Sequence, residues 1–479
     1  MLDLLLLALA IIPNQDEAPA PVPATAGVKA ERLPPTPWPV LAFEADQTDW
    51  DGLIDRIGQG ALDDLDVPGL TIAVSLGDDV VFERGYGFAN LEHEVPAGPE
   101  TIYRIGSVTK QFTAAAIMGL VEEGELALED DARDHLPWFD TDGRRVSVRQ
   151  LLTHTSGVPS YTDLGLEWMA KLHQDVTPEE IFGWVSEVPF DFEPGTDWHY
   201  SNTGYILLGA LIKEVGRRSP RTQLRRTVTK GLGLASIDYD NYREVIPHRA
   251  AGYDPGLRGP INAQFISMTQ PGAAGAIIAT AGDLLRWQRA LVSGQVISQH
   301  SYAQMTAPAF LPDGRSTGYG FGLSVGRLNG LRRISHGGGI MGFSSALAWY
   351  PEVELGVCVL TNRSGVDATG IERSVTRNVL GMLRPLDIDL PVDADQRAAL
   401  VGRYAFLSFE LEVSEVDGEL LRTVVGSDTV PRRLVHRGDL AFGLDEDPDL
   451  LIRFQAGPDG RIATAVVEED GNELVGVRR

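Results

Sequence analysis

Residues 105–124 read Ile-Gly-Ser-Val-Thr-Lys-Gln-Phe-Thr-Ala-Ala-Ala-Ile-Met-Gly-Leu-Val-Glu-Glu-Gly. Apolar side chains are dense in this stretch, which predicts a buried helix from Ser107 to about Glu123. Gly124 stands where the C-terminal cap of such a helix is expected. If Ser107 opens the helix, Lys110 lies one turn later on the same face, where its amine can reach the serine hydroxyl.

The spacing Ser107-x-x-Lys110 therefore marks a candidate catalytic pair. A serine hydroxyl becomes a strong nucleophile only when a base takes its proton. A lysine can be that base if burial or a nearby cation lowers its pKa. The N-terminus of a helix adds backbone N–H groups and the positive end of the helix dipole. A capping serine followed by an ordinary lysine is the alternative interpretation.

A second candidate element is Tyr200-Ser-Asn202, which follows a Pro-Gly turn and precedes a helix predicted from Asn202 to about Val215, with Gly216 ending it. A tyrosine oxygen near a lysine can relay a proton. An asparagine amide offers both a donor and an acceptor, with which it can hold Lys110 or a substrate amide. The alternative is an asparagine that caps a helix beside a packed tyrosine.

A third candidate element is His336-Gly-Gly-Gly339, at the end of a predicted strand. Glycines such as Gly338 and Gly339 let a substrate backbone approach a strand closely. The alternative is a glycine turn after a strand, with a surface histidine. A lipase-type pattern, Gly-x-Ser-x-Gly, also occurs around Ser324, but it lies in a strand pattern rather than a strand-turn-helix, so we assign it no catalytic role.

The rest of the main region alternates strand and helix patterns. Two strands at 70–76 and 80–86 flank a Gly-Asp-Asp turn, which predicts a β-hairpin. Asp283 is placed to cap a helix that runs to Val292. Further elements are predicted as strands over 319–325, 332–336, 344–350 and 356–361 and as a helix over 375–383. Strands at both ends with helices between them predict an α/β (α+β) fold.

Taken together, the Ser-x-x-Lys, Tyr-x-Asn and His-x-Gly motifs occur in an order that resembles the serine β-lactamase and penicillin-binding-protein superfamily. The class C-like branch is the most similar, and it includes D,D-carboxypeptidases, D-aminopeptidases and esterases. The flanking segments 67–73, 151–157 and 342–345 resemble this family too. The resemblance implies a domain over 41–385, with an antiparallel sheet flanked by helices beside a helical subdomain.

The same resemblance assigns roles to residues of this chain. Ser107 would be the acyl-enzyme nucleophile. Lys110 and Tyr200 would be the proton-transfer pair, and which of them is the base stays open. Asn202 would position the reacting groups, and the backbone N–H groups of Ser107 and Gly339 would form an oxyanion hole. The resemblance implies neither a metal nor an organic cofactor.

His336 stands where the related β-lactamases carry a lysine. A free histidine titrates near pH ~6.5, so a fixed positive charge for a β-lactam carboxylate is lost. We therefore expect an ester, amide or β-lactam substrate, small molecule or peptide, and favour an esterase or a D-amino-acid peptidase over an efficient β-lactamase. The alternative function is binding of penicillin or cell-wall peptides without turnover.

The two ends of the chain differ from the region between them. The apolar run 4–12 is too short to span a bilayer, which takes about 20 residues. We therefore predict a signal peptide over 1–20 and export to the periplasm or beyond, with no lipid anchor because no cysteine follows. Residues 21–40 form a Pro/Ala-rich linker. Strand patterns between glycine turns over 391–479 predict a small all-β module, lipocalin-like by resemblance.

The composition excludes other classes of function. The chain has 67 acidic and 41 basic residues, and its formal net charge at pH 7 is −26. An acidic surface repels phosphate backbones, so we expect no nucleic-acid partner. The single cysteine, Cys358, lies in an apolar strand pattern and is read as a core residue. The histidines show no metal-ligand spacing, and the oligomeric state stays open.

Overall fold

The structure is a computed structural model that describes residues 50–382, 389–406, 409–425, 431–444, 450–469 and 472–479. The predicted signal peptide over 1–20 and the predicted linker over 21–40 lie outside these residues. None of the described helices combines the length and the apolar character needed to cross a membrane.

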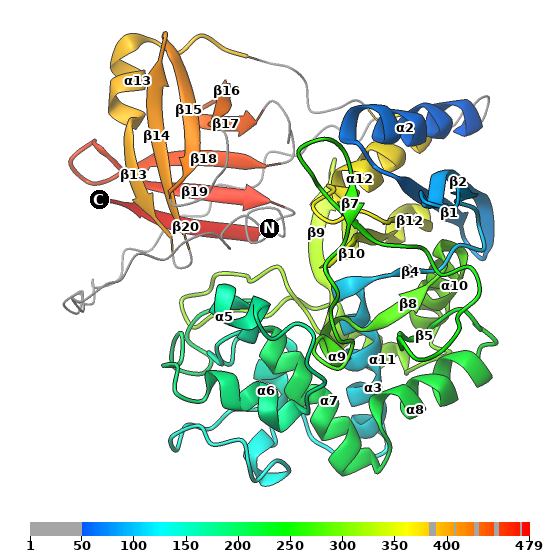
Figure 1. Cartoon of the computed structure of the whole chain (residues 1–479). Coiled ribbons are helices and arrows are strands. Elements are labelled where there is room, and N and C mark those ends of the chain that lie inside the picture. The colour runs from blue at the N-terminus through cyan, green and yellow to red at the C-terminus, as the bar shows by residue number, and fades with distance from the viewer. Residues whose placement is uncertain (1–49, 383–388, 407–408, 426–430, 445–449, 470–471) are drawn as a thin grey trace.

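A seven-stranded antiparallel sheet forms the centre of the main region (Figure 1). Its strand order is β3-β2-β1-β12-β11-β10-β9, so strands from the two ends of the region pair at its middle. The hairpin predicted around the Gly-Asp-Asp turn is present as β1 and β2. The strands are β1 Gly69–Leu76, β2 Asp79–Asn90, β3 Val95–Pro96, β9 Ser324–Leu328, β10 Leu331–Ile340, β11 Phe343–Tyr350 and β12 Leu355–Thr361.

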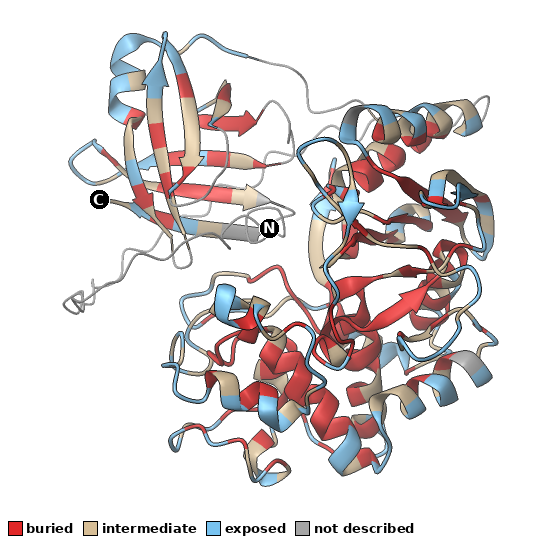
Figure 2. Cartoon of the chain, in the orientation of Figure 1, coloured by how far each residue is buried: buried red, intermediate tan, exposed pale blue. Residues whose placement is uncertain are grey.

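Helices cover both faces of this sheet, which confirms the predicted fold class. On one face, α2 (Trp50–Leu65) packs against α12 (Ala368–Val379), and α12 contacts β11 and β12. On the other face, α10 (Ala281–Val292) contacts β1 and β12. Every residue of β11 and β12 is buried, so apolar side chains follow one another in these strands instead of alternating with exposed polar ones; the two buried serines of β11, Ser344 and Ser345, are the polar exceptions before Thr361 at the end of β12 (Figure 2).

The helical region is organised around α7, which contacts α3, α4, α6 and α9. Most of its side chains are buried, and this explains its apolar composition. A small three-stranded sheet has the order β4-β8-β5, and its strands come from before α3 and from after α8 in the sequence. These elements are α3 Lys110–Glu122, α4 Val148–Leu152, α5 Leu166–Met169, α6 Pro178–Val185, α7 Asn202–Gly216, α8 Pro220–Leu224, α9 Gly272–Gly275, α11 Gln299–Met305, β4 Tyr103–Arg104, β5 Asp238–Tyr239 and β8 Ile277–Ala279.

Residues 105–124 fold nearly as predicted, but the α-helix begins later than expected. A 3-10 turn, η1 (Gly106–Thr109), precedes the α-helix, which begins at Lys110 rather than at Ser107. Ser107 is therefore on the turn and Lys110 on the first helical position. Gly124 has a φ of +71° and follows the helix end, as a C-terminal glycine should.

Two other predicted helix ends are wrong by a short distance. Asp283 does not cap α10, because the N-cap is Thr280, whose hydroxyl oxygen accepts the Asp283 backbone N–H at 3.3 Å. By contrast, α7 ends at Gly216 as predicted, and Arg217 after it has the positive φ of 56°. The helix predicted over 375–383 is α12, which begins earlier and ends at Val379.

The C-terminal module is a closed barrel of eight antiparallel strands with its own apolar core. The expectation of an all-β module missed a short helix, α13 (Ala394–Leu400), which has a capping box between Asp393 and Gln396. The barrel closes because β13 pairs with β20 at the other end of the module. The strands are β13 Gly402–Ala405, β14 Glu410–Val416, β15 Glu419–Val424, β16 Arg432–Gly438, β17 Ala441–Leu444, β18 Leu451–Ala456, β19 Ile462–Glu469 and β20 Asn472–Arg478.

Cys358 and Ser324, to which the sequence analysis assigned no catalytic role, lie in strands of the sheet. Cys358 is fully buried in β12, and burial raises the pKa of its thiol. Ser324 is the first residue of β9, an edge strand that continues into a hairpin with β10 rather than into a helix. The strand predicted over 319–325 therefore begins late, at Ser324. Neither residue has the setting of a nucleophile.

Candidate active site

Ser107 is held by a turn that packs tightly on the edge of the sheet. The turn η1 contacts β10, and its first residue, Gly106, has a φ of +48°, in the left-handed region that favours glycine. A Cβ at Gly106 would lie 2.9 Å from Gly339 N and 3.0 Å from Gly339 O. Only glycine permits this approach, so Gly106 places Ser107 directly beside the backbone of Gly339.

Lys110 is fully buried, with 0% of its surface exposed. Its Nζ lies 3.1 Å from Ser107 Oγ, 2.8 Å from Asn202 Oδ1 and 3.0 Å from the carbonyl oxygen of Ala274. Burial lowers the pKa of this amine well below its ordinary value, because a low-dielectric environment disfavours the ammonium form. Burial thus shifts Lys110 toward the neutral amine, which is the form that a base requires.

The partners of Lys110 fix the direction of its lone pair. The Ala274 carbonyl and Asn202 Oδ1 can only accept hydrogen bonds, so they take the two N–H groups of a neutral amine. If the amine is neutral, its remaining lone pair faces the Ser107 hydroxyl, the one of these three partners that can donate a proton. This geometry suits proton transfer from Ser107 to Lys110.

Tyr200 packs its ring beside the same amine. Lys110 Nζ lies 4.6 Å from the ring centroid of Tyr200 and 5.3 Å from that of Tyr205. The Tyr200 hydroxyl is buried without a well-aligned hydrogen bond to any described residue. Burial raises its pKa, and the nearby Ser107 hydroxyl opposes this effect only in part. Tyr200 is therefore a neutral phenol, which can donate a proton.

Asn202 is the first residue of α7, and the N-cap of that helix is Ser201 rather than Asn202. The backbone N–H of Asn202 donates to Ser160 Oγ at 3.0 Å, and its Nδ2 donates to Thr162 Oγ1 at 3.2 Å. With Oδ1 bound to Lys110, both ends of the side-chain amide have a hydrogen-bond partner. Asn202 thus joins the Lys110 amine to a second segment of the helical region.

His336 is buried, with 2% of its surface exposed, so it is not a surface residue. Its Nδ1–H donates to the Gly337 carbonyl at 2.6 Å, and its Nε2 accepts from the Tyr319 hydroxyl at 2.8 Å. A carbonyl can only accept, so the ring proton is on Nδ1 and the imidazole is neutral. Burial, followed by the charge that Lys110 carries when it is protonated, lowers its pKa to about 3. The position offers no positive charge near neutral pH.

The end of β10 has an open backbone edge. Ile340 and Phe343 close a two-residue hairpin with β11, so the N–H of Gly339 points away from β11 in the alternating ladder. On that side β9 pairs with β10 only as far as Ser335. The Gly339 N–H therefore faces η1. Gly338, whose Cβ would overlap a backbone carbonyl, also requires glycine.

Two aromatic residues of the site had no predicted role. The His154 ring packs at a tilt against the rings of Tyr200 and Tyr319, with ring centroids 4.3 Å and 4.7 Å away. His154 is buried and accepts the Ser201 backbone N–H on Nδ1 at 3.1 Å. His154 lay in a segment that resembled the family, but Tyr319 precedes a strand whose start was placed wrongly, so no sequence signal singled it out.

An antiparallel sheet covered by helices on both faces, with a Ser-x-x-Lys turn against one strand edge, is the architecture of β-lactamases and penicillin-binding proteins. A model of the Beta-lactamase family matches residues 54–404 of this chain. The chain belongs to this family.

Three similar proteins illustrate its range. Penicillin-binding protein 4* of Bacillus subtilis (strain 168) is 27% identical over 356 residues, which cover 70% of this chain and 78% of that protein. A D-aminopeptidase of Gluconobacter oxydans (strain 621H) is 26% identical over 297 residues, 62% of this chain and 56% of that protein. An octameric penicillin-binding protein homologue from Pyrococcus abyssi has a TM-score of 0.66 at 26% identity, over 88% of this chain and 99% of that one. The family therefore includes hydrolase relatives of this chain.

Proposed function

We propose that this chain is a serine hydrolase that forms an acyl-enzyme on Ser107 and cleaves amide bonds of D-amino-acid substrates. The observation that carries the mechanism is the position of the buried Lys110 Nζ, which lies 3.1 Å from Ser107 Oγ and donates to two groups that can only accept, Asn202 Oδ1 and the Ala274 carbonyl. The D-aminopeptidase relative supports the substrate class.

The reaction would begin with attack of Ser107 Oγ on the substrate carbonyl while Lys110 takes the hydroxyl proton. The backbone N–H groups of Ser107 and Gly339 would stabilise the oxyanion, and losing one such donor typically costs about 2.7–4 kcal/mol. Tyr200, whose pKa is raised by burial, would pass a proton to the leaving amine. Water would then hydrolyse the ester on Ser107 by the reverse transfers.

The neutral state of His336 argues against efficient β-lactam hydrolysis. A β-lactam carries a carboxylate that is bound best by a fixed cation. His336 is held neutral by Tyr319 and by burial, so that cation is absent from this position. We expect faster turnover for D-aminoacyl amides than for penicillins.

The first experiment compares Ser107→Ala with Ser324→Ala on D-alanine p-nitroanilide, L-alanine p-nitroanilide and a chromogenic penicillin. Of the three substrates, wild type and Ser324→Ala should hydrolyse the D-anilide fastest. In Ser107→Ala, kcat should fall about 10⁴-fold or more. Wild-type turnover by Ser107→Ala would contradict the assignment of Ser107 as the nucleophile. A penicillin adduct without turnover of any substrate would support the alternative function, binding of penicillin or cell-wall peptides without turnover.

A second experiment separates the two tyrosines beside Lys110. Tyr200→Phe removes the hydroxyl that we assign to proton transfer, and kcat should fall about 10²- to 10⁴-fold. Tyr205→Phe is the matched control, because the Tyr205 hydroxyl donates to the Leu152 carbonyl at 2.8 Å and plays no part in the reaction. Similar losses in both variants would mean that ring packing, not proton transfer, is being measured.

A further inference from the structure

The orientation of the Asn202 side chain is a chemical requirement of the site. Its Oδ1 must face Lys110, because the reversed amide would set N–H groups against the N–H groups of the amine. The position of Asn202 on α7 does not by itself determine which end of the amide faces Lys110. A hydrogen-bond acceptor on the Nδ2 side of the amide would add to the selection that Lys110 makes on the Oδ1 side.

Two hydroxyl groups from the segment before α7 contact Asn202. Ser160 Oγ accepts its backbone N–H at 3.0 Å, and Thr162 Oγ1 accepts its Nδ2–H at 3.2 Å. The two hydroxyls are themselves 2.8 Å apart and share a hydrogen bond. Ser160 is buried, so its hydroxyl is not simply a surface group that happens to lie nearby.

The turn that carries Thr162 is anchored on both sides of that residue. In η3 (Tyr161–Leu164), the backbone N–H of Tyr161 donates to Thr203 Oγ1 at 2.9 Å. Asp163 Oδ2 lies 3.7 Å from His199 Nε2, and His199 Nδ1 lies 2.6 Å from Asp191. Burial acts to lower the pKa of His199, but the two carboxylates outweigh it and raise that pKa. These contacts hold the turn against residues 199–203.

We propose that Thr162, supported by Ser160, is a positioning residue for the reaction: its hydroxyl fixes the Asn202 amide so that Oδ1 faces Lys110 and the amine lone pair stays on Ser107. Thr162 acts through Asn202 and touches no reacting atom. The inference rests on the proposed function, since it assigns Lys110 the part of the base.

The test is Thr162→Val, which replaces the hydroxyl by a methyl group of similar shape, beside Thr162→Ser, which keeps the hydroxyl. In Thr162→Val the amide is free to turn, and kcat on the D-anilide should fall about 10- to 100-fold with KM little changed. Thr162→Ser should restore most of the rate. Thr306→Val is a matched control, because Thr306 is buried and its hydroxyl donates to the Tyr302 carbonyl.

The pH profile gives a readout that a merely structural role would not move. Lys110 faces Ser107, Asn202, Tyr200 and Tyr205, and its charge is felt by His154 and His336. Turning the Asn202 amide removes an acceptor from the ammonium form, so the acid limb of the kcat profile should move to lower pH in Thr162→Val.

Wild-type kcat, KM and pH profile in Thr162→Val would overturn the proposal, and so would an equal loss in Thr162→Ser. If Thr162→Val does not fold, Ser160→Ala tests the same hydroxyl pair, with an expected smaller loss of kcat; an unchanged kcat would again overturn it. The proposed function fails separately, because it requires Ser107→Ala to be inactive whatever Thr162 does.

Discussion

Lys110 and Tyr200 show how one buried environment can produce an acid and a base. Burial disfavours the charged form of each group, so it lowers the pKa of the lysine and raises that of the tyrosine. The lysine then tends to be a neutral amine and the tyrosine a neutral phenol. On these grounds we propose Lys110 as the base and Tyr200 as the proton donor, a choice that the motifs alone leave open.

This assignment predicts the pH dependence of the enzyme. The proposed base requires a neutral Lys110, so kcat/KM should rise with pH through the lowered lysine pKa, at a lower pH than the titration of an ordinary lysine. In Lys110→Arg, kcat/KM should fall about 10²- to 10⁴-fold, because a guanidinium cannot lose its proton and act as a base. For the same reason the acid limb of the pH profile should disappear. Lys213→Arg, at an exposed position of α7, is the control. An unchanged acid limb in Lys110→Arg would show that another group is the base.

The sequence predicted these residues because their spacing is local or because a family resemblance names them. Ser107 and Lys110 are one turn apart, and Tyr200 and Asn202 share one short motif. Thr162 and Tyr319 could not be predicted, because their contacts with Asn202 and His336 join segments 40 and 17 residues apart. Nothing in the local pattern of a polar turn indicates which distant amide it will meet.

At the scale of elements, the approach of η1 to β10 is the contact that would set the geometry of the proposed oxyanion hole. Gly106→Ala would place a Cβ against Gly339 N and strain a left-handed residue. We expect kcat to fall about 10²- to 10³-fold and stability to fall by about 1–3 kcal/mol. Gly124→Ala shares the positive φ but meets no atom within 4 Å, so it should lose stability only. Kinetics and urea unfolding of both variants distinguish the two effects.

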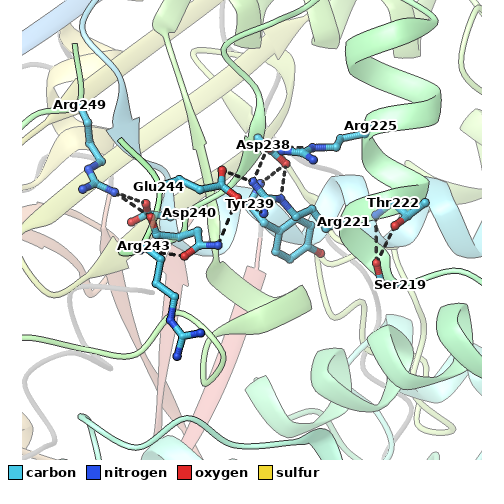
Figure 3. Close-up of polar contacts among 11 residues, drawn as sticks. Ser219, Arg221, Thr222, Arg225, Asp238, Tyr239, Asp240, Arg243, Glu244 and Arg249 are labelled. Carbon is cyan, nitrogen blue, oxygen red and sulfur yellow. Dashed lines mark hydrogen bonds and ion pairs between the residues drawn. The ribbon is translucent and has the colours of Figure 1, made fainter. Parts of the chain in front are cut away.

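The strand that leads into η1 is anchored by a buried carboxylate. Asp240 has no exposed side-chain surface and pairs with Arg104 of β4 at 2.7 Å and with Arg249 at 2.8 Å (Figure 3 shows the Arg249 side). Asp240→Asn leaves both arginines without a counter-charge, and we expect a loss of about 3 kcal/mol in unfolding free energy. Denaturant unfolding measures it.

Figure 3 also contains the control for that prediction. Glu244 pairs with Arg221 at 2.7 Å but is more exposed, and Arg221 also binds Asp238 at 2.8 Å. Glu244→Gln should therefore cost no more than about 1 kcal/mol. Equal losses in Asp240→Asn and Glu244→Gln would contradict the anchoring role of Asp240.

Helix positions were predicted better than helix ends. The dense apolar runs fix where α3 and α7 lie, whereas their ends depend on which residue adopts the capping conformation. Ser107 remains on a 3-10 turn because η1 has to fit against β10, and Arg217 takes the left-handed position although a glycine precedes it. Both outcomes depend on tertiary contacts.

At the scale of the whole molecule, the barrel has a core separate from the two cores of the main region. Phe442 is fully buried in it and packs on Phe454, with ring centroids 5.7 Å apart. Phe442→Ala should destabilise the barrel by about 3–5 kcal/mol. Hydrogen exchange should show faster opening of the barrel strands, with α3 and α7 unchanged. Equal acceleration in both regions would mean that they unfold as one unit.

The strand patterns predicted an all-β module at this end of the chain, and only the family resemblance implied that it is lipocalin-like. Turn glycines and apolar runs predict strands one by one, whereas pairing of β13 with β20 depends on residues more than 70 positions apart, such as Tyr404 and Arg478. The helix α13 is short, with one fully buried leucine, Leu400, so its pattern was too weak to separate from the strands.

The most direct test of the central claim is covalent trapping of the nucleophile. An activated phosphonate ester should label the full chain once, and peptide mapping should place the label on Ser107. Labelling should be absent in Ser107→Ala, much slower in Lys110→Arg and unchanged in Ser324→Ala. A label on another residue, or the same label in Ser107→Ala, would contradict a serine nucleophile activated by Lys110.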